Sequence, residues 1–302
     1  MNCSIDRIFK YACLACATLA VLLMVAFFVQ MGAAGAEAWR TFGLGFLTSA
    51  QWDPARGEFG ALAPLTGTLL TTLIALALAV PPAFAAALFL TGTRPAVGAF
   101  LGNAIDLLAA IPSVIYGMWG LFVLAPVMQK YVQPFCSRWL GFEHVPFLGG
   151  GSNGFGVFTA GVILAVMVLP FVCAIMRDVL RMTPPVLREA AYGVGCTRLE
   201  VTKDVVMRYG MRGLVGAALI GLGRALGETM AVLFVVGNQI HLPAGLFDSG
   251  TTIAATLANS FAEADGLERS ALFALGMVLL GLSFAIQLLA HCYLAAVGKV
   301  RK

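Results

Sequence analysis

Charged side chains are scarce in this sequence of 302 residues. Asp, Glu, Lys and Arg make up only 11% of it, whereas hydrophobic residues make up 60% and the mean hydropathy is +0.91. A soluble globular domain carries about 25% charged residues, because it needs them to cover its surface. The shortage excludes a soluble enzyme of this length as well as a disordered or collagen-like chain. The sequence therefore predicts an integral membrane protein.

The sequence motifs of catalysis and metal binding are also missing. The only Gly-Lys pair is Gly298-Lys299, and Val300 follows it where a nucleotide-binding P-loop requires Ser or Thr. The sequence has no HExxH motif, no cluster of Cys and His residues and no nucleophile elbow, and its seven cysteines are scattered. We therefore expect no catalytic residue, no metal site, no bound cofactor and no structural disulfide in this chain.

Long apolar runs are abundant instead. A transmembrane helix needs about 20 apolar residues, and continuous runs of this length are typical of helices rather than of barrel strands. The apolar part of the first run, residues 12–29, is longer than the core of a signal peptide, so we expect an uncleaved anchor. The sequence predicts an all-α membrane protein with about six spans, at residues 11–31, 65–91, 105–128, 157–177, 213–237 and 270–297.

The basic residues are distributed unevenly between the two sides of these spans. One side, which includes both termini, holds 13 of the 19 Lys and Arg residues, and the other side holds five. Cytoplasmic loops carry the excess of Lys and Arg, so both termini are expected in the cytoplasm. We divide the chain into an N-terminal anchor with a periplasmic loop (1–64), a membrane domain (65–297) and a cytoplasmic tail (298–302).

The long inside connection, residues 178–212, has the signals of two short helices. Thr183 can cap the first helix with Pro184 at its first position, and Gly193 or Gly195 can end it. Thr197 can cap the second helix, because Glu200 follows three residues later as in a capping box.

The same connection also carries small side chains at Ala190, Ala191 and Gly195. These small side chains leave a shallow surface to which another protein could bind closely. The alternative is a charged loop that merely satisfies the positive-inside rule.

Glu189-Ala190-Ala191-x-x-x-Gly195 is similar to the EAA signature of the membrane subunits of bacterial ABC importers. The usual signature ends nine residues later in I-x-L-P, whereas this chain has Arg208 in place of the proline. Three longer stretches, residues 111–117, 188–197 and 221–231, resemble the PstC family of phosphate-importer membrane subunits.

This resemblance implies a type I ABC importer transmembrane domain in the bacterial inner membrane, with inorganic phosphate as its substrate. It implies a PstA-like permease partner, two PstB-like ATPase subunits and a PstS-like periplasmic phosphate-binding protein. Membrane lipid would surround the complex, and no nucleic acid would bind. The residues implied in ATPase coupling are Arg188, Glu189, Ala190, Ala191 and Gly195.

Two charged residues, Arg224 and Glu228, lie inside the predicted fifth span. A charge in mid-bilayer costs roughly 2.5–3.5 kcal/mol on insertion scales, so both should face protein. They are four residues apart and are expected to pair on one helical face. The pair either joins helices or serves the substrate pathway, with the Arg224 fork binding the anion. Thr229 either lines the same pathway or bonds to its own helix.

Three other functions share parts of this pattern. Permeases for another oxyanion, molybdate or sulfate, would have the same fold and the same kinds of partner. An ion-driven secondary transporter would work without an ATPase and would not need the EAA-like loop. A membrane scaffold without transport activity would not need Arg224 in the membrane.

Overall fold

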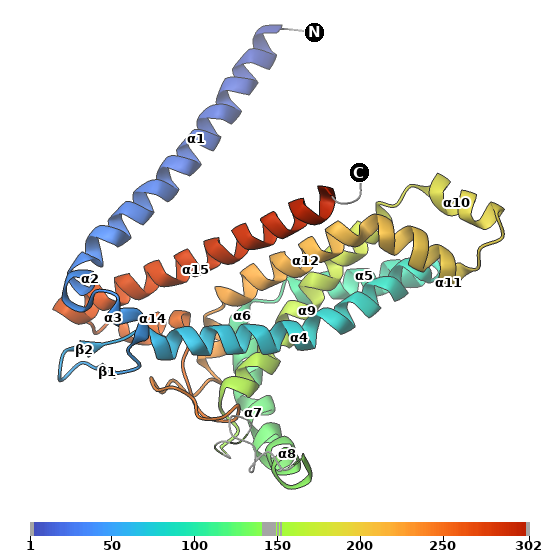
Figure 1. The fold of residues 1–302 in the computed structure, drawn as a ribbon. Coiled ribbons are helices and arrows are strands. Elements are labelled where there is room, and N and C mark those ends of the chain that lie inside the picture. Colours follow the sequence, from blue (N-terminus) through green and yellow to red (C-terminus); the bar gives the residue numbers. More distant parts are fainter. Residues whose placement is uncertain (1–2, 141–148, 150, 152, 300–302) are drawn as a thin grey trace.

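The computed structural model describes residues 3–140, 149, 151 and 153–299, and most of them are in helices that run alongside one another (Figure 1). Five helical segments are long and apolar enough to cross a membrane, or six if one sharply bent pair is taken as a single span. The prediction of a helical protein with about six spans is confirmed. The long helices are α1 (Cys3–Ala34), α4 (Leu62–Gly92), α9 (Val157–Arg181), α12 (Arg208–Leu226) and α15 (Gly266–Lys299).

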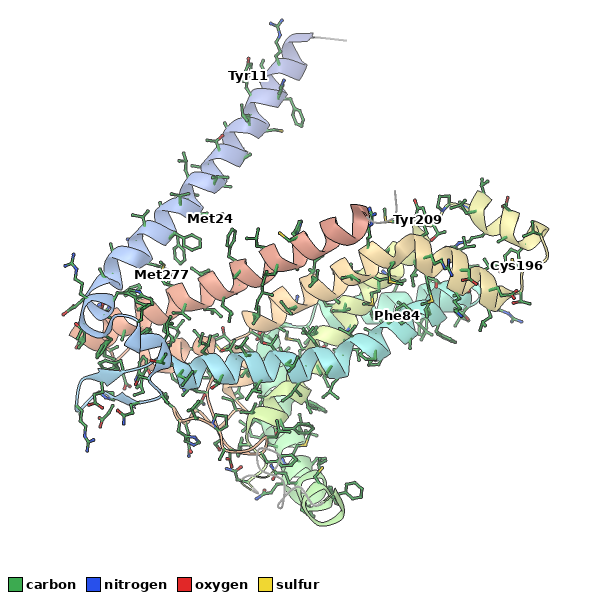
Figure 2. The ribbon with its side chains drawn as sticks, in the orientation of Figure 1. Tyr11, Met24, Phe84, Cys196, Tyr209 and Met277 are labelled. Carbon is green, nitrogen blue, oxygen red and sulfur yellow. The ribbon has the colours of Figure 1, made fainter. Side chains whose placement is uncertain are left out.

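Helix α1 extends away from the rest of the chain (Figure 1). Its residues 7–27 are exposed, and side chains such as Tyr11 and Met24 have no neighbours around them (Figure 2). The helix meets the body at its C-terminal end, where the Ser270 hydroxyl donates a hydrogen bond to the Ala34 carbonyl (2.9 Å). So large an apolar surface requires cover by lipid or by another subunit.

A small aromatic core follows α1. The aromatic rings of this segment pack on one another, with Phe46 fully buried against Trp39 and Phe59 close to Trp52. The strand register places Trp52 opposite Phe59. The elements of this segment are α2 (Ala36–Phe42), α3 (Gly45–Thr48), β1 (Trp52–Asp53) and β2 (Glu58–Phe59).

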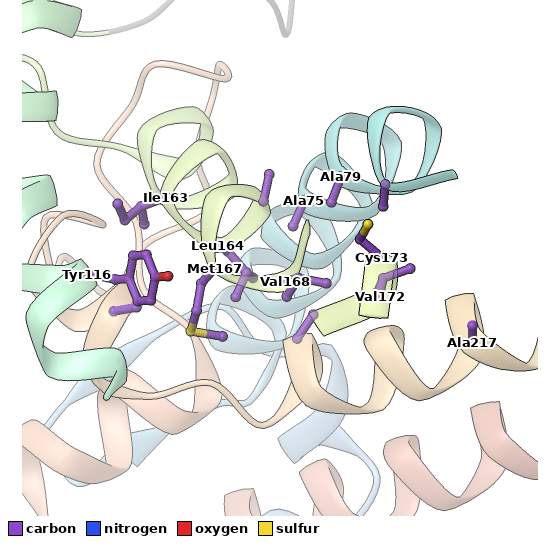
Figure 3. Packing of buried hydrophobic residues seen from close by; sticks show 14 of the residues in the cluster. Ala75, Ala79, Tyr116, Ile163, Leu164, Met167, Val168, Val172, Cys173 and Ala217 are labelled. Carbon is purple, nitrogen blue, oxygen red and sulfur yellow. The ribbon is translucent and has the colours of Figure 1, made fainter. Parts of the chain in front are cut away.

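Helices α4 and α9 pack against each other along much of their length (Figure 3). Four alanines recur every fourth residue on α4 and are fully buried, so their small side chains line one face of that helix. On α9, a Cβ at Gly161 would lie only 2.5 Å from Ile74. Small residues let two backbones approach closely, which is how helices gain contact in lipid. The four alanines are Ala75, Ala79, Ala83 and Ala87.

The predicted third span is not one straight helix. Helix α5 (Pro95–Ala109) ends before Pro112, and the chain turns by 87° before it continues. Pro112 has no N–H to continue the helix, and the Tyr116 hydroxyl bonds back across the break to the Leu108 carbonyl (2.8 Å). The continuation consists of α6 (Ser113–Trp119), η1 (Gly120–Leu124), α7 (Ala125–Val127), η2 (Met128–Val132) and α8 (Gln133–Leu140).

An ion pair joins α5 to α9. The Arg177 side chain is buried in α9, with Nη1 3.2 Å from Asp106 Oδ2 on α5 and Nε 3.1 Å from Asp178 Oδ1. Gly102 provides the room for it, since a Cβ there would lie 2.8 Å from Nη1. Arg177 therefore joins two helices through its charge.

The predicted fifth span, 213–237, is also wrong in its bounds. The helical stretch starts earlier, with α11 (Arg198–Glu200) and η4 (Val201–Met207), and α12 ends at Leu226, just before Gly227. Beyond this break the chain is mostly irregular and contains α13 (Met230–Leu233) and α14 (Ile253–Ser260).

The α4–α9 contact predicts opposite effects for two Gly→Ala substitutions. Gly161→Ala forces a Cβ into the stiff, branched Ile74 side chain and should destabilise the protein by about 1–3 kcal/mol. Gly281→Ala on α15 meets nothing within 4 Å and should stabilise its helix by up to about 1 kcal/mol. Thermal unfolding of the purified chain in detergent measures both changes. Melting temperatures that move in the same direction would contradict this account of the packing.

Candidate functional site

Helix α10 (Pro185–Gly193) protrudes from the end of the helical body between α9 and α11 (Figure 1). Pro185 occupies its first turn and Pro184 is its N-cap, so the expected cap at Thr183 is wrong. The Thr183 side chain is buried instead, and its Oγ1 has no hydrogen-bond partner among the described residues. The two consecutive prolines shift the start by one residue, because both have the fixed φ that suits a helix start.

The C-terminal end of α10 is a Schellman turn. Gly195 adopts φ +89°, the Cys196 N–H donates to the Ala191 carbonyl (3.1 Å), and the Gly195 N–H donates to the Tyr192 carbonyl (3.0 Å). A residue with a side chain is strained at such a φ, and this requirement explains glycine at position 195.

The next helix starts with the predicted capping box. The Thr197 N–H donates to Glu200 Oε2 (2.7 Å), and the Glu200 N–H donates to Thr197 Oγ1 (3.4 Å). The predicted first short helix and the glycine turn after it are therefore confirmed. The second helix is not short, because α11 continues through η4 into α12 as one helical stretch, Arg198–Leu226. The turn fixes the direction of the chain on both sides of residues 194–196.

Arg188 attaches α10 to the body. Its Nη2 donates to the carbonyl of Leu180 in the last turn of α9 (2.8 Å). The other residues of the EAA-like stretch face outward: Glu189, Ala190 and Gly195 are exposed and Ala191 is half-buried. The structure thus brings together all five residues implied in coupling, with one side chain turned inward and four positions accessible.

Large apolar side chains surround this stretch on the outer surface. Val186 on α10, Val194 directly after it and Leu199 on α11 are 71%, 82% and 76% exposed. An exposed apolar group of this size, rimmed by charged residues, is typical of a protein–protein contact.

Arg224 lies in the last turn of α12, next to a cavity of about 470 Å³ between α9, α12 and α15. Its guanidinium carbon is 4.8 Å from the centre of the Phe171 ring, a cation–π contact. Its Nε atom is buried with no hydrogen-bond partner among the described residues. The cavity is lined by Phe171, Gly216, Leu219, Ile220, Gly223, Arg224, Gln287, Ala290 and His291.

The expected pair between Arg224 and Glu228 does not form. No ion pair joins these two residues in the described part of the chain, and Glu228 Oε1 instead accepts the Ala231 N–H at the start of α13 (3.2 Å). The physical reason is the helix end at Leu226, because residues four apart share a face only within a continuous helix.

Thr229 is also separate from Arg224. Its hydroxyl donates to the Gly227 carbonyl (3.4 Å), and the residue lines a second cavity beside α1 and α14. The three predicted pathway residues therefore cluster in sequence around the break, but Arg224 and Thr229 line two different cavities.

Two polar side chains beside Arg224 were missed from the sequence. Gln287 and His291 come from α15, and the Gly223 position allows close approach, since a Cβ there would lie 2.9 Å from Gln287 Nε2. Their spacing of four residues places both on one helical face. That spacing inside an apolar run is the signal that could have identified them.

Comparison with known proteins identifies a family. The family described as "Binding-protein-dependent transport system inner membrane component" matches residues 67–293. The phosphate transport system permease protein PstC of Pasteurella multocida is 45% identical over 280 residues, which is 91% of this chain and 87% of that protein. PstC of Mesorhizobium japonicum is 46% identical over 292 residues, covering 95% and 89% of the two chains.

Solved structures show the same fold at low sequence identity. A chain of the bacterial alginate ABC transporter superposes with a TM-score of 0.61 at 16% identity, over 95% of this chain and 94% of that one. A chain of the MetNI methionine ABC transporter, in an inward-facing conformation, gives 0.58 at 18% identity, over 82% and 99%. The predicted type I ABC importer fold and the resemblance noted in the sequence are confirmed. The chain belongs to the family of binding-protein-dependent transport system inner membrane components, in which its relatives include the PstC permease proteins.

Proposed function

We propose that this chain is the membrane-spanning permease subunit of an ATP-driven importer of inorganic phosphate in the bacterial inner membrane. The observation that carries the proposal is its identity of 45–46% with phosphate transport permeases over more than nine-tenths of its length. The chain itself is not an enzyme. Because the sequence has no P-loop, ATP hydrolysis takes place on separate subunits.

The proposed assembly contains a PstA-like permease subunit, a PstB-like ATPase dimer and a PstS-like periplasmic phosphate-binding protein. Two surfaces support the need for partners. The apolar length of α1 lies bare in the isolated chain, and the tip of α10 presents exposed apolar side chains. A homologous permease subunit would complete the path, and the ATPases would bind at residues 188–195.

Both termini lie in the cytoplasm in the proposed orientation, because the excess of Lys and Arg falls on their side. Residues 1–64 then form the anchor with its periplasmic segment, 65–297 the permease domain, and 298–302 a cytoplasmic tail. The segment 178–212, which contains α10, faces the ATPases.

This orientation predicts the location of fused reporters. A reporter joined after Arg198 should be active as a cytoplasmic fusion, and one joined after Arg56, in the turn between β1 and β2, should be active as a periplasmic fusion. Paired alkaline phosphatase and green fluorescent protein fusions report the two sides. A periplasmic residue 198 would overturn the orientation and the coupling assignment together.

The contacts of Arg188 support a mechanical role for α10 in coupling. Its bond to Leu180 joins α10 to α9, and Arg177 joins α9 to α5 through Asp106. A movement imposed on α10 by ATPase closure would therefore pass to α9 and to the helices packed on it. Glu189, Ala190, Ala191 and Gly195 would form the surface that the ATPase grips.

Substitutions in this surface should uncouple the complex without unfolding the chain. Ala190→Glu places a charge in the close-approach surface, and Gly195→Ala strains a residue held at φ +89° by about 1–3 kcal/mol. Both should reduce copurification of the ATPase subunits. The matched controls are Ala96→Glu, exposed at the start of α5, and Gly193→Ala, which meets nothing within 4 Å and lacks a positive φ. Normal copurification and transport-coupled hydrolysis in the Ala190→Glu complex would contradict the assignment.

Arg224 is the residue that we assign to anion contact in the pathway. Its buried Nε has no hydrogen-bond partner in the described part of the chain, and its planar fork suits two phosphate oxygens. The Phe171 ring packs against one face of the guanidinium, a cation–π contact that favours a cation in an apolar setting. The Glu228 carboxylate accepts the Ala231 N–H just after the end of α12. Thr229 follows that helix end and bonds to the Gly227 carbonyl.

The Arg224 assignment predicts a loss of uptake that does not depend on Glu228. Arg224→Gln removes a charged hydrogen-bond donor and should lower phosphate uptake by roughly tenfold or more. Arg224→Lys keeps the charge but loses the fork, so it should restore uptake only in part. Uptake is measured in cells that lack other phosphate systems and is normalised to assembled complex, with excess sulfate or molybdate as competitors.

Two further variants make this test sharper. Glu228→Gln keeps an oxygen that can accept the Ala231 N–H, so it should be mild and should not rescue Arg224→Gln. Arg269→Gln is the matched control, because Arg269 also stacks on an aromatic ring, that of Phe261 (5.7 Å). Near-normal phosphate uptake by the Arg224→Gln variant would mean that Arg224 has a structural role and does not contact the anion. Uptake abolished by excess sulfate or molybdate would point to another oxyanion as substrate.

A further inference from the structure

A groove of about 1180 Å³ lies between the C-terminal half of α4 and the helical stretch formed by α11 and η4. One end of it is basic, with Arg94, Arg198 and Lys203 in its lining. The remainder is mainly apolar, and Phe84, one of its lining residues, is labelled on α4 in Figure 2. The groove is lined by Phe84, Leu88, Phe89, Gly92, Thr93, Arg94, Arg198, Leu199, Thr202, Lys203 and Met207.

Among the described residues, the three cations of the groove have no acidic partner. None of them takes part in an ion pair within the described residues, and no Asp or Glu lines the groove. The two acids nearest in sequence are engaged elsewhere: Glu200 bonds to Thr197, and Asp204 pairs with Arg208 (3.0 Å). A cluster of free positive charge therefore remains at the end of an apolar cavity.

The groove has the dimensions of an amphiphile rather than of a soluble anion. The nine residues from Phe84 to Gly92 rise about 12 Å along α4, which is most of one leaflet of a hydrocarbon core about 30 Å thick. Pockets for small ligands enclose about 300–1,000 Å³, less than this groove. A small anion would occupy only the basic end and would leave the apolar wall uncovered.

We infer that this groove binds an anionic phospholipid, with the phosphate headgroup between Arg94, Arg198 and Lys203 and an acyl chain along Phe84, Leu88 and Phe89. Basic pockets between transmembrane helices on the cytoplasmic side suit such headgroups. The inference rests on the proposed orientation, which places the basic end at the inner leaflet. The bound lipid would sit beside the base of the coupling segment, because Arg198 and Leu199 follow directly after the Gly195 turn.

A soluble protein partner fits the groove less well. A soluble subunit could reach the three cations, but it could not extend along α4 to Phe84 inside the hydrocarbon region. A single molecule with an anionic part and an apolar part matches both the basic end of the groove and its apolar wall.

Native mass spectrometry of the full-length chain in a mild detergent tests the inference. Phosphatidylglycerol and cardiolipin should give retained adducts, and phosphatidylcholine should give few. Each cation near an anionic headgroup contributes roughly fivefold in affinity, so Arg94→Gln/Arg198→Gln/Lys203→Gln should weaken phosphatidylglycerol binding by about a hundredfold. The charge-matched control Arg7→Gln/Lys10→Gln/Arg181→Gln removes three cations that do not line the groove and should change binding little.

A second variant and a competitor test the two parts of the proposed ligand. Phe89→Ala, at a side chain that is 59% exposed, should weaken phosphatidylglycerol binding several-fold without altering the preference over phosphatidylcholine. Glycerol 3-phosphate, which lacks acyl chains, should not displace the lipid.

Three results would overturn the inference. Equal losses of lipid in the two triple variants would mean unspecific attraction to a basic surface. Displacement by glycerol 3-phosphate would mean a headgroup site without an acyl groove. Unchanged lipid retention together with lost ATPase copurification in the groove variant would mean a protein-docking surface. Counting lipid adducts does not require transport activity. A negative result in the phosphate-uptake test would therefore not change the interpretation of the lipid-binding measurement.

Discussion

The close contact between α4 and α9 is the interaction on which the rest of the membrane domain depends. Lipid tails are as apolar as the helices, so apolar burial alone does not drive helices together, and close van der Waals contact must hold them. Ala75 and Ala79 on α4, with Gly161 on α9, allow that approach. Because α9 is buried along most of its length, it provides the fixed support to which Arg177 ties α5 and Arg188 ties α10.

Two interruptions of the backbone shape the region around Arg224. The bend before Pro112 and the helix end at Leu226 both fall within apolar runs, where free N–H and carbonyl groups are costly. Each is compensated locally: Tyr116 bonds to the Leu108 carbonyl, and Glu228 accepts the Ala231 N–H. The Glu228 carboxylate is thereby committed to the backbone, which leaves Arg224 without a neighbouring acid to neutralise it.

Local signals allowed much of the fold and of the coupling segment to be predicted. The Gly195 turn and the Thr197–Glu200 box depend only on a few adjacent residues, and the structure has both. The prediction of an Arg224–Glu228 pair was wrong because it assumed a continuous helix through both residues, whereas α12 ends at Leu226. The four-residue spacing of Gln287 and His291 indicates a shared helical face but not which segment that face meets. Their position beside Arg224 and the Arg177–Asp106 ion pair depend on contacts between segments far apart in the chain.

The basic residues counted on one side of the spans have different physical environments. Arg177 and Arg188 turn inward and hold helices together through Asp106 and the Leu180 carbonyl, so their charges are already engaged. Arg94, Arg198 and Lys203 line an open groove and have no acidic partner among the described residues. Unlike Arg177 and Arg188, this second group can attract an anion from outside the chain. Because the groove and α10 are connected through the short turn at residues 194–197, whatever fills the groove also sets the surroundings of the segment proposed to receive the ATPase.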